Sequence, residues 1–208
     1  CQRVAEAACV GVWKQKGSVM IRHDDAVMAV KQLLEALGAD EGEHTADTPE
    51  RVARAWQDML WGYNDDADAH LLKTFPGPQE PGLVIQAGID VQSVCAHHML
   101  PFGGHATVAY LPAPGDRIVG LSKLTRVAYA YSARLQVQER IGWQIADSID
   151  RMLAPVGVYV VITAVHDCIR LRGARSPAST TTTVARRGAL DSQDVALIQN
   201  AHVSAKSY

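Results

Sequence analysis

The sequence is poor in cysteine and in aromatic residues, and it has no long hydrophobic run. Only four cysteines, Cys1, Cys9, Cys95 and Cys168, occur in 208 residues, which excludes a disulfide-rich scaffold. No apolar run approaches the ~18–20 residues of a membrane span, and no basic region followed by an apolar segment opens the chain. We therefore expect a cytoplasmic protein that does not contact a membrane.

The sequence also lacks an excess of charge of either sign. Lys and Arg total 20 against 22 Asp and Glu, a formal net charge of −2, which argues against a nucleic-acid partner held by bulk electrostatics. Neither glycine-rich nucleotide fingerprint, the G-x-x-x-x-G-K-[ST] loop or the G-x-G-x-x-G turn, is present. With 48% hydrophobic and 20% charged residues, the chain is a folded globular protein in which any anion site must be local.

The N-terminal third has helical periodicity. Apolar residues repeat at helical spacing over 24–38, and Gly38 suits the position after the last helical turn. A second helix is predicted to begin with Thr48 as N-cap and Pro49 in the first turn. The proline- and glycine-rich segment 75–82 then predicts a loop. We place a boundary there, between an N-terminal helical region (1–82) and a catalytic domain (83–208).

The second region alternates strands and helices. Strands are predicted at about 83–94, 105–111 and 118–119, followed by a helix capped by Ser122 and a longer helix from about residue 137. A strand at about 158–171 comes next. This order predicts an α+β domain with a largely antiparallel sheet and a helix pair.

Two clusters combine cysteine with histidine. Cys95 and His98 have Cys-x-x-His spacing, and His166 and Cys168 follow about 70 residues later, so that together they could hold zinc. On the predicted strand, alternate residues share a face, which would align Cys168 with Arg172. Buried cysteines, hydrogen-bonded histidines and a Cys95–Cys168 disulfide are the ordinary structural alternatives.

Several charged residues point to an anionic ligand. Lys123 and Arg126 occupy the start of a predicted helix, where the helix dipole disfavours cations and a bound phosphate would offset the cost. Arg51 and Arg54 form a similar pair one turn apart, for which a solvated helix face is the simpler interpretation. Glu139 could accept two N–H bonds from a guanine-like edge, or stabilise a helix start.

Taken together, these segments resemble the GTP cyclohydrolase I family over about residues 48–188. The matching stretches are 95–98, 101–102, 105–112, 120–123, 135–140, 166–168 and 172–175. The resemblance implies a tunnelling fold (T-fold) that assembles into a toroidal homo-oligomer, a decamer, with active sites between subunits. It also implies Zn2+ as cofactor and GTP as substrate, hydrolysed at C8 and rearranged to 7,8-dihydroneopterin triphosphate with loss of formate.

The resemblance assigns roles residue by residue. The implied zinc ligands are Cys95, His98 and Cys168, and the implied catalytic groups are His97, His166 and Ser122. Glu139, assisted by Gln138, would bind the guanine edge. The triphosphate would be bound by Lys123, Arg126 and Arg172, and by Arg51 and Arg54 from a neighbouring subunit.

One residue departs from the family pattern. Ala96 stands where the family has glutamate, which removes a carboxylate beside the metal ligands. A specialised homologue with another purine substrate or a shortened reaction is therefore an alternative. A nitrile reductase relative acting on a deazaguanine, and a non-catalytic binding subunit, are further alternatives. The downstream pathway stays open.

Overall fold

The computed structural model describes residues 21–39 and 42–205; Cys1 and Cys9 lie outside these ranges. The helices are α1 (His23–Leu37), α2 (Thr48–Met59), α3 (Leu121–Ser132), α4 (Gln138–Leu153), α5 (Asp167–Arg170) and α6 (Ser192–Ser204), with short turns η1 (Gly42–His44), η2 (Trp61–Asn64) and η3 (Ala67–Leu71). The strands are β1 (Thr74–Pro76), β2 (Val84–Cys95), β3 (Pro101–Leu111), β4 (Arg117–Val119), β5 (Leu135–Gln136), β6 (Gly157–His166) and β7 (Thr181–Gly188).

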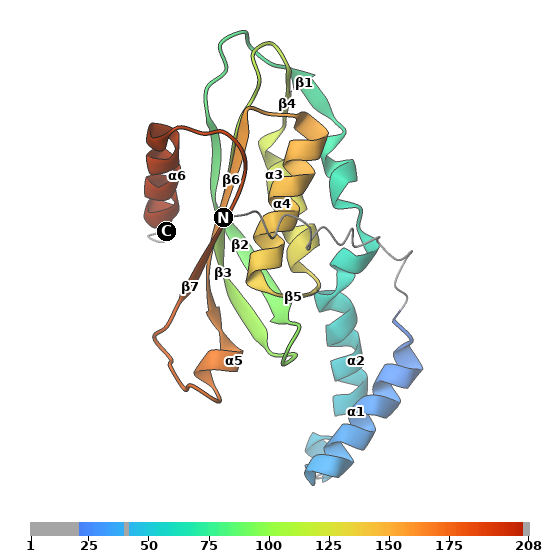
Figure 1. Ribbon diagram of the computed structural model, residues 1–208. Coiled ribbons are helices and arrows are strands. Elements are labelled where there is room, and N and C mark those ends of the chain that lie inside the picture. Colours follow the sequence, from blue (N-terminus) through green and yellow to red (C-terminus); the bar gives the residue numbers. More distant parts are fainter. Residues whose placement is uncertain (1–20, 40–41, 206–208) are drawn as a thin grey trace, which may run out of the picture.

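A five-stranded sheet in the order β5-β2-β3-β6-β7 forms the centre of the molecule. Its long strands pair antiparallel, and only the two-residue β5 runs parallel to β2. Figure 1 shows α3 and α4 on one face of this sheet and α6 on the other. The expected α+β class and largely antiparallel sheet are confirmed.

The main hydrophobic core lies between the sheet and the α3–α4 pair. Apolar residues four apart on α4, Ile141, Ile145 and Ile149, are fully buried against it. A smaller cluster on the other face, which includes Tyr159 and Ile198, seats α6. Because the sheet is packed on both faces, its central strands can hold the residues at their ends in fixed positions.

Helices α1 and α2 pack against each other and project from the body of the molecule (Figure 1). The α1 helix ends as expected, because Gly38 adopts the left-handed conformation at φ 63°. Within residues 21–39 and 42–205, no helix is long and apolar enough to cross a membrane. The η3 turn and β1 connect the helices to the body, where Ala67 and Leu71 join the main core. The division at residue 82 stays a prediction.

Two predicted helix caps are wrong by one or two positions. Asp47 and not Thr48 occupies the N-cap of α2, and the Asp47 carboxylate accepts a hydrogen bond from Arg51 at 2.9 Å. Gly120 and not Ser122 is the N-cap of α3. Ser122 is therefore inside the first turn, and its side chain is exposed.

Two predicted strand limits also differ. Strand β3 begins at Pro101, because the tight turn after Cys95 lets Pro101 pair with Val94. Strand β6 ends at His166 instead of about residue 171, since Phe102, its last partner on β3, lies opposite His166. The residues that follow form α5, so the predicted alignment of alternate side chains from 166 to 172 on a strand is wrong. A short strand, β1, also lies where a loop was predicted, and pairs with β4.

Two elements were absent from the sequence prediction although their signals are in the sequence. The β7 segment is rich in threonine and contains valine, both of which favour strands. The α6 helix begins with a clear cap, because the Asp191 carboxylate accepts bonds from the backbone N–H groups of Gln193 and Asp194, each at 2.8 Å.

The close approach of β3 and β6 can be tested by substitution of Gly104. A Cβ at Gly104 would lie 2.0 Å from the carbonyl oxygen of Thr163 and 2.6 Å from the Cα of Ala164. We expect Gly104→Ala to lower the free energy of unfolding by at least the ~1–3 kcal/mol typical of overpacking, because backbone atoms cannot move aside. The measurement is urea unfolding, with Gly82→Ala as control, since a Cβ at Gly82 meets nothing within 4 Å. Equal stability of the two variants would contradict this close approach.

Candidate metal centre and acid–base site

A tight turn between β2 and β3 places Cys95 and His98 on the same side of the chain. The backbone N–H groups of His98 and Met99 donate to the carbonyl oxygen of Cys95 at 3.4 and 2.8 Å, and Met99 adopts a left-handed φ of 53°. As a result, Nδ1 of His98 lies 3.7 Å from Sγ of Cys95. The Cys-x-x-His spacing thus brings two potential ligand atoms together by local geometry.

The end of β6 supplies the third potential ligand. Strand β6 is antiparallel to β3, so its C-terminal end lies beside the β2–β3 turn, and α5 folds Cys168 back toward Cys95. The ligand atoms of Cys95, His98 and Cys168 lie within 4.8 Å of one another. Zinc bonded to two sulfurs and one nitrogen would separate them by about 3.5–3.8 Å, so small side-chain movements suffice.

The donor set fits a catalytic rather than a closed structural metal site. Cys95 is buried, Cys168 is half-buried and His98 is exposed, so one side of the group faces solvent. Burial raises the pKa of the Cys168 thiol, with a further rise from the adjacent Cys95 thiol. Both thiols are free, so the alternative of a Cys95–Cys168 disulfide is wrong. Three protein ligands with an open side are typical of catalytic zinc.

His166 lies at the edge of this group in a defined environment. Its ring stacks on Phe102 with centroids 4.5 Å apart and planes 9° apart. Burial lowers the pKa of the imidazole, although the Glu139 carboxylate opposes that shift. Nε2 of His166 is 2.7 Å from Oε1 of Gln138, whose side chain is buried. No separate role was predicted for Phe102, because its stacking on His166 depends on the pairing of β3 with β6.

Three further predicted residues gather around the metal group. His97 is exposed in the same turn, with its ring edge-on to His98 at 6.2 Å. Nη1 of Arg172 lies 3.0 Å from Nε2 of His98 and donates to the carbonyl oxygen of Cys168 at 3.2 Å. Glu139 is exposed in the first turn of α4. The predicted placement of Cys168 and Arg172 on one strand is wrong, because α5 folds the two residues together.

Ala96 is exposed in the same turn, and its backbone N–H donates to the carbonyl oxygen of Gln136 at 2.8 Å. This bond joins the turn to β5, directly before α4. The Asp167 carboxylate pairs with Arg170 at 2.7 Å. Because its charge is already compensated by this arginine, it does not replace the carboxylate that a glutamate at position 96 would supply.

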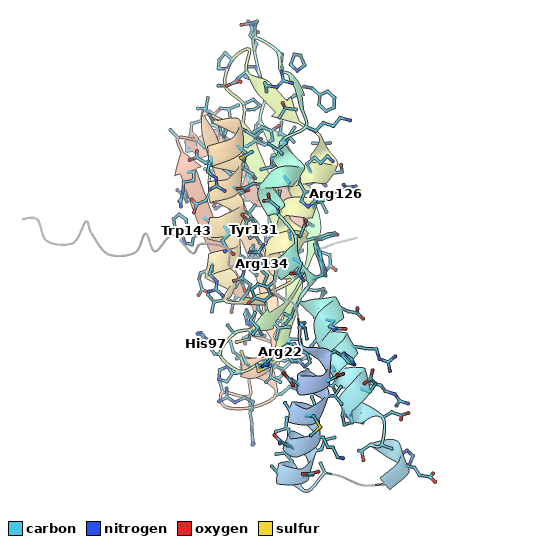
Figure 2. All side chains as sticks on the ribbon, turned by 90° about the vertical axis from the view of Figure 1, so that its right-hand side faces the viewer. Arg22, His97, Arg126, Tyr131, Arg134 and Trp143 are labelled. Carbon is cyan, nitrogen blue, oxygen red and sulfur yellow. The ribbon has the colours of Figure 1, made fainter. Side chains whose placement is uncertain are left out.

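Ser122, Lys123 and Arg126 lie elsewhere in the same chain. They occupy the beginning of α3, next to β4, whereas the metal group lies beyond the other end of this helix (Figure 1). Arg126 precedes the helix end at Ser132 by six residues, about 9 Å along the axis, and Ser122 by about 15 Å. Figure 2 shows Arg126 and His97 at different heights of the molecule.

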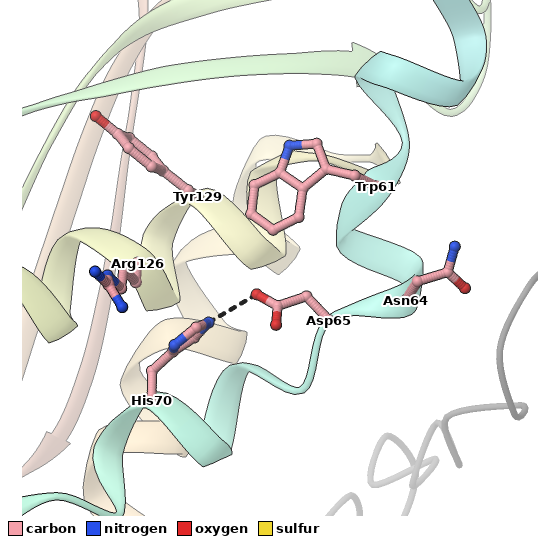
Figure 3. A pocket seen from close by; sticks show the side chains of 6 residues that line it. All are labelled: Trp61, Asn64, Asp65, His70, Arg126 and Tyr129. Atoms are coloured by element: carbon pink, nitrogen blue, oxygen red, sulfur yellow. Dashed lines mark hydrogen bonds and ion pairs between the residues drawn. The ribbon is translucent and has the colours of Figure 1, made fainter. Parts of the chain in front are cut away.

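Arg126 instead lines an open pocket of about 410 Å³ on the α3 side of the molecule, with Trp61, Asn64, Asp65, His70 and Tyr129 (Figure 3). Asp65 and His70 face each other there, with Oδ2 and Nε2 2.7 Å apart. The sequence prediction missed this pocket, because η2 and η3 have no strong periodicity.

Arg51 and Arg54 lie on the exposed side of α2, and each forms an ion pair with an acidic residue four positions earlier in the sequence. Arg51 contacts Asp47 at 2.9 Å and Arg54 contacts Glu50 at 3.5 Å. Such pairs match the simpler interpretation of a solvated helix face, and exposed pairs of this kind contribute little to stability. A role for the two arginines in binding substrate stays a prediction.

The fold and this site define a class: an α+β protein with a three-ligand candidate metal centre beside two imidazoles and several cations. The profile of the GTP cyclohydrolase I family matches residues 26–202. The chain therefore belongs to the GTP cyclohydrolase I family, as the resemblance implied.

Individual relatives agree with this assignment. The chain is 46% identical over 164 residues to the GTP cyclohydrolase 1 of Mycobacteroides abscessus, covering 78% of this chain and 80% of that protein. It is 47% identical over 161 residues to that of Desulforamulus reducens, covering 77% and 85%. For Carboxydothermus hydrogenoformans the identity is 44% over 170 residues, covering 81% and 88%.

Among solved structures, the crystal structure of the archaeosine synthase QueF-Like in the apo form matches with a TM-score of 0.41 and 13% identity. It covers 55% of this chain and 99% of that chain, and the likeness is too slight to bear on function. Membership of the GTP cyclohydrolase I family favours a hydrolase over a nitrile reductase relative or a non-catalytic subunit.

The three-ligand group predicts a clear result for metal binding. We expect Cys168→Ser to lower zinc affinity by more than about 100-fold, because loss of a direct ligand exceeds the effect of losing an outer contact. Competition with a chromophoric chelator measures this. Asp167→Asn is the matched control, since its carboxylate pairs with Arg170 and is not among the clustered ligand atoms. Equal affinity of Cys168→Ser and the native protein would contradict the assignment.

Proposed function

We propose that the protein is a zinc-dependent GTP cyclohydrolase I, which hydrolyses the C8 position of GTP and rearranges the product to 7,8-dihydroneopterin triphosphate and formate. The observation that carries the proposal is the convergence of Cys95, His98 and Cys168 beside His97 and His166. A purely structural metal site requires neither imidazole. Family membership supplies the substrate class.

Zinc bound by Cys95, His98 and Cys168 would activate water for attack on C8. The chain's own residues then supply proton transfer and orientation. His97 is exposed beside the ligand His98, where it can protonate the purine nitrogen as the imidazole ring opens. His166, whose imidazole pKa is lowered by burial, can accept a proton during ribose opening and rearrangement.

Substrate recognition would use one anionic and several cationic groups. The exposed Glu139 carboxylate can accept two N–H bonds from the guanine edge. Arg172 lies at the metal group and can reach a phosphate there. Ser122 would lie near the ribose, and the other phosphate contacts would come from Lys123, Arg126, Arg51 and Arg54.

These last residues lie apart from the metal group of the same chain. The remaining length of α3 separates Ser122, Lys123 and Arg126 from Cys95, His98 and Cys168, which favours a site completed by a second copy of the chain. We therefore propose a toroidal homo-oligomer of tunnelling-fold subunits, a decamer, with each active site between subunits. Closed symmetric assembly would repeat the same contact at every interface. A cytoplasmic location stays a prediction from the sequence.

Because alanine stands at position 96 in place of the family's glutamate, a second candidate function is that of a homologue with a shortened reaction or another purine substrate. The observation that favours it is the absence of a carboxylate at this exposed position of the metal turn. The two candidates give different products from GTP.

The reaction itself is tested with zinc-loaded protein and GTP, followed by mass spectrometry. We expect formate and dihydroneopterin triphosphate, both lost when a chelator removes the metal. Replacement of the proposed proton acceptor in His166→Ala should lower kcat by about 10²–10⁴-fold. An opened formamide, or formate without pterin, would favour the shortened reaction, and intact GTP would contradict the proposal.

The shared site is tested by subunit mixing. His166→Ala and Arg126→Ala should each be nearly inactive alone. Unfolded together and refolded as mixed assemblies, they should regain activity at up to about a quarter of the sites, where each neighbour supplies the intact half. Co-refolding of His166→Ala with His97→Ala is the control, because both residues belong to the same half. No recovery in the first mixture would contradict a site between subunits.

A further inference from the structure

The side chain of Gln138 is directed into the protein, away from any position where it could bind substrate in this conformation. It is only 2% exposed, although it opens α4 directly before the exposed Glu139. Its amide nitrogen lies 2.9 Å from the carbonyl oxygen of Ile162, 3.0 Å from that of Thr181 and 3.1 Å from Oγ1 of Thr183. Its amide oxygen lies 2.7 Å from Nε2 of His166.

These contacts determine which end of the amide is the nitrogen. Two of the three atoms around one end are carbonyl oxygens, which can only accept hydrogen bonds, so that end must be the NH2 group. A flipped amide would place its oxygen against both carbonyl oxygens in a buried site, which is strongly unfavourable. The other end is therefore the oxygen, and it can only accept.

The amide oxygen in turn determines the tautomer of His166. Since Oε1 of Gln138 cannot donate, Nε2 of His166 must carry the proton in their 2.7 Å contact. In the neutral ring the lone pair is then on Nδ1. Phe102, stacked 4.5 Å from the ring, fixes the plane in which that lone pair points.

We propose that Gln138 is a positioning residue for His166, which holds its neutral imidazole as the Nε2–H tautomer and leaves Nδ1 as the proton-accepting atom. The role deepens the proposed function and rests on it for the catalytic step. It replaces direct binding of guanine by the Gln138 side chain, because all the amide's polar atoms already contact protein.

The tautomer is measured directly, without reference to activity. In zinc-loaded protein with 15N-labelled histidine, magic-angle-spinning NMR distinguishes protonated from unprotonated ring nitrogens. The His166 signals are assigned by their loss in His166→Phe. At about pH 8.5, some two units above the ordinary histidine pKa of ~6.5, we expect protonated Nε2 and unprotonated Nδ1. A proton on Nδ1 of native His166 overturns the proposal, even if Gln138 variants fail to fold.

Gln138→Met tests the consequence for catalysis, because methionine has similar length but its thioether sulfur is only a weak acceptor for the ring N–H. We expect the His166 spectrum to show a mixture of tautomers, and kcat to fall by about 10- to 100-fold with KM for GTP within about threefold. Gln144→Met is the matched control on the same helix. Gln144 contacts Gln136 at 2.7 Å and not His166, so its variant should keep the native tautomer and kcat.

The remaining outcomes separate the two proposals. A tenfold rise in KM with unchanged kcat in Gln138→Met overturns the positioning role in favour of direct contact with guanine. Native kinetic constants in Gln138→Met overturn it as well. If the native protein does not act on GTP, the proposed function fails, while the NMR result still decides whether Gln138 fixes the His166 tautomer.

Discussion

The position of β3 between β2 and β6 is the constraint on which the site depends. The pairing of Val94 with Pro101 fixes the turn that contains Cys95 and His98, and the pairing of Phe102 with His166 fixes where β6 ends. Because both registers meet at the first two residues of β3, a shift of either strand by one residue would move ligands to opposite faces of the sheet. Tight packing supports this arrangement, since Gly104 leaves no room for a side chain between β3 and β6.

The length of α3 separates two groups of proposed active-site residues, the cations and Ser122 of its first turns and the metal group. The α3 helix runs along one face of the sheet, with its cationic first turns at one end and the metal group beyond the other. This separation supports the proposal that each active site is formed by neighbouring copies of the chain. A monomer could still bind metal, because all three ligands come from one chain.

Buried glutamine side chains link the secondary structure to a proposed catalytic residue. Gln136 and Gln138 flank the start of α4 and are almost completely buried. Gln136 bonds to Tyr131 and Gln144 within the α3–α4 layer, while Gln138 joins β6 and β7 to His166. A buried amide in a low-dielectric site has strong directional preferences, because each unpaired polar atom is costly. Through such contacts, rigid secondary structure can fix the orientation and the tautomer of a catalytic ring.

The candidate metal ligands, the helix pair, the α+β class and the family could all be predicted from the sequence. These features depend on local spacing and periodicity, as in the Cys-x-x-His turn and the repeat of isoleucines on α4. The sequence did not show that Cys168 follows a helical turn, that Phe102 stacks on His166, or that Gln138 points inward. These points follow from the three-dimensional packing, because they depend on where β6 loses its partner strand and on which atoms surround a side chain. Strand ends and buried hydrogen bonds are set by contacts between segments far apart in the chain, and local propensity carries little information about such contacts.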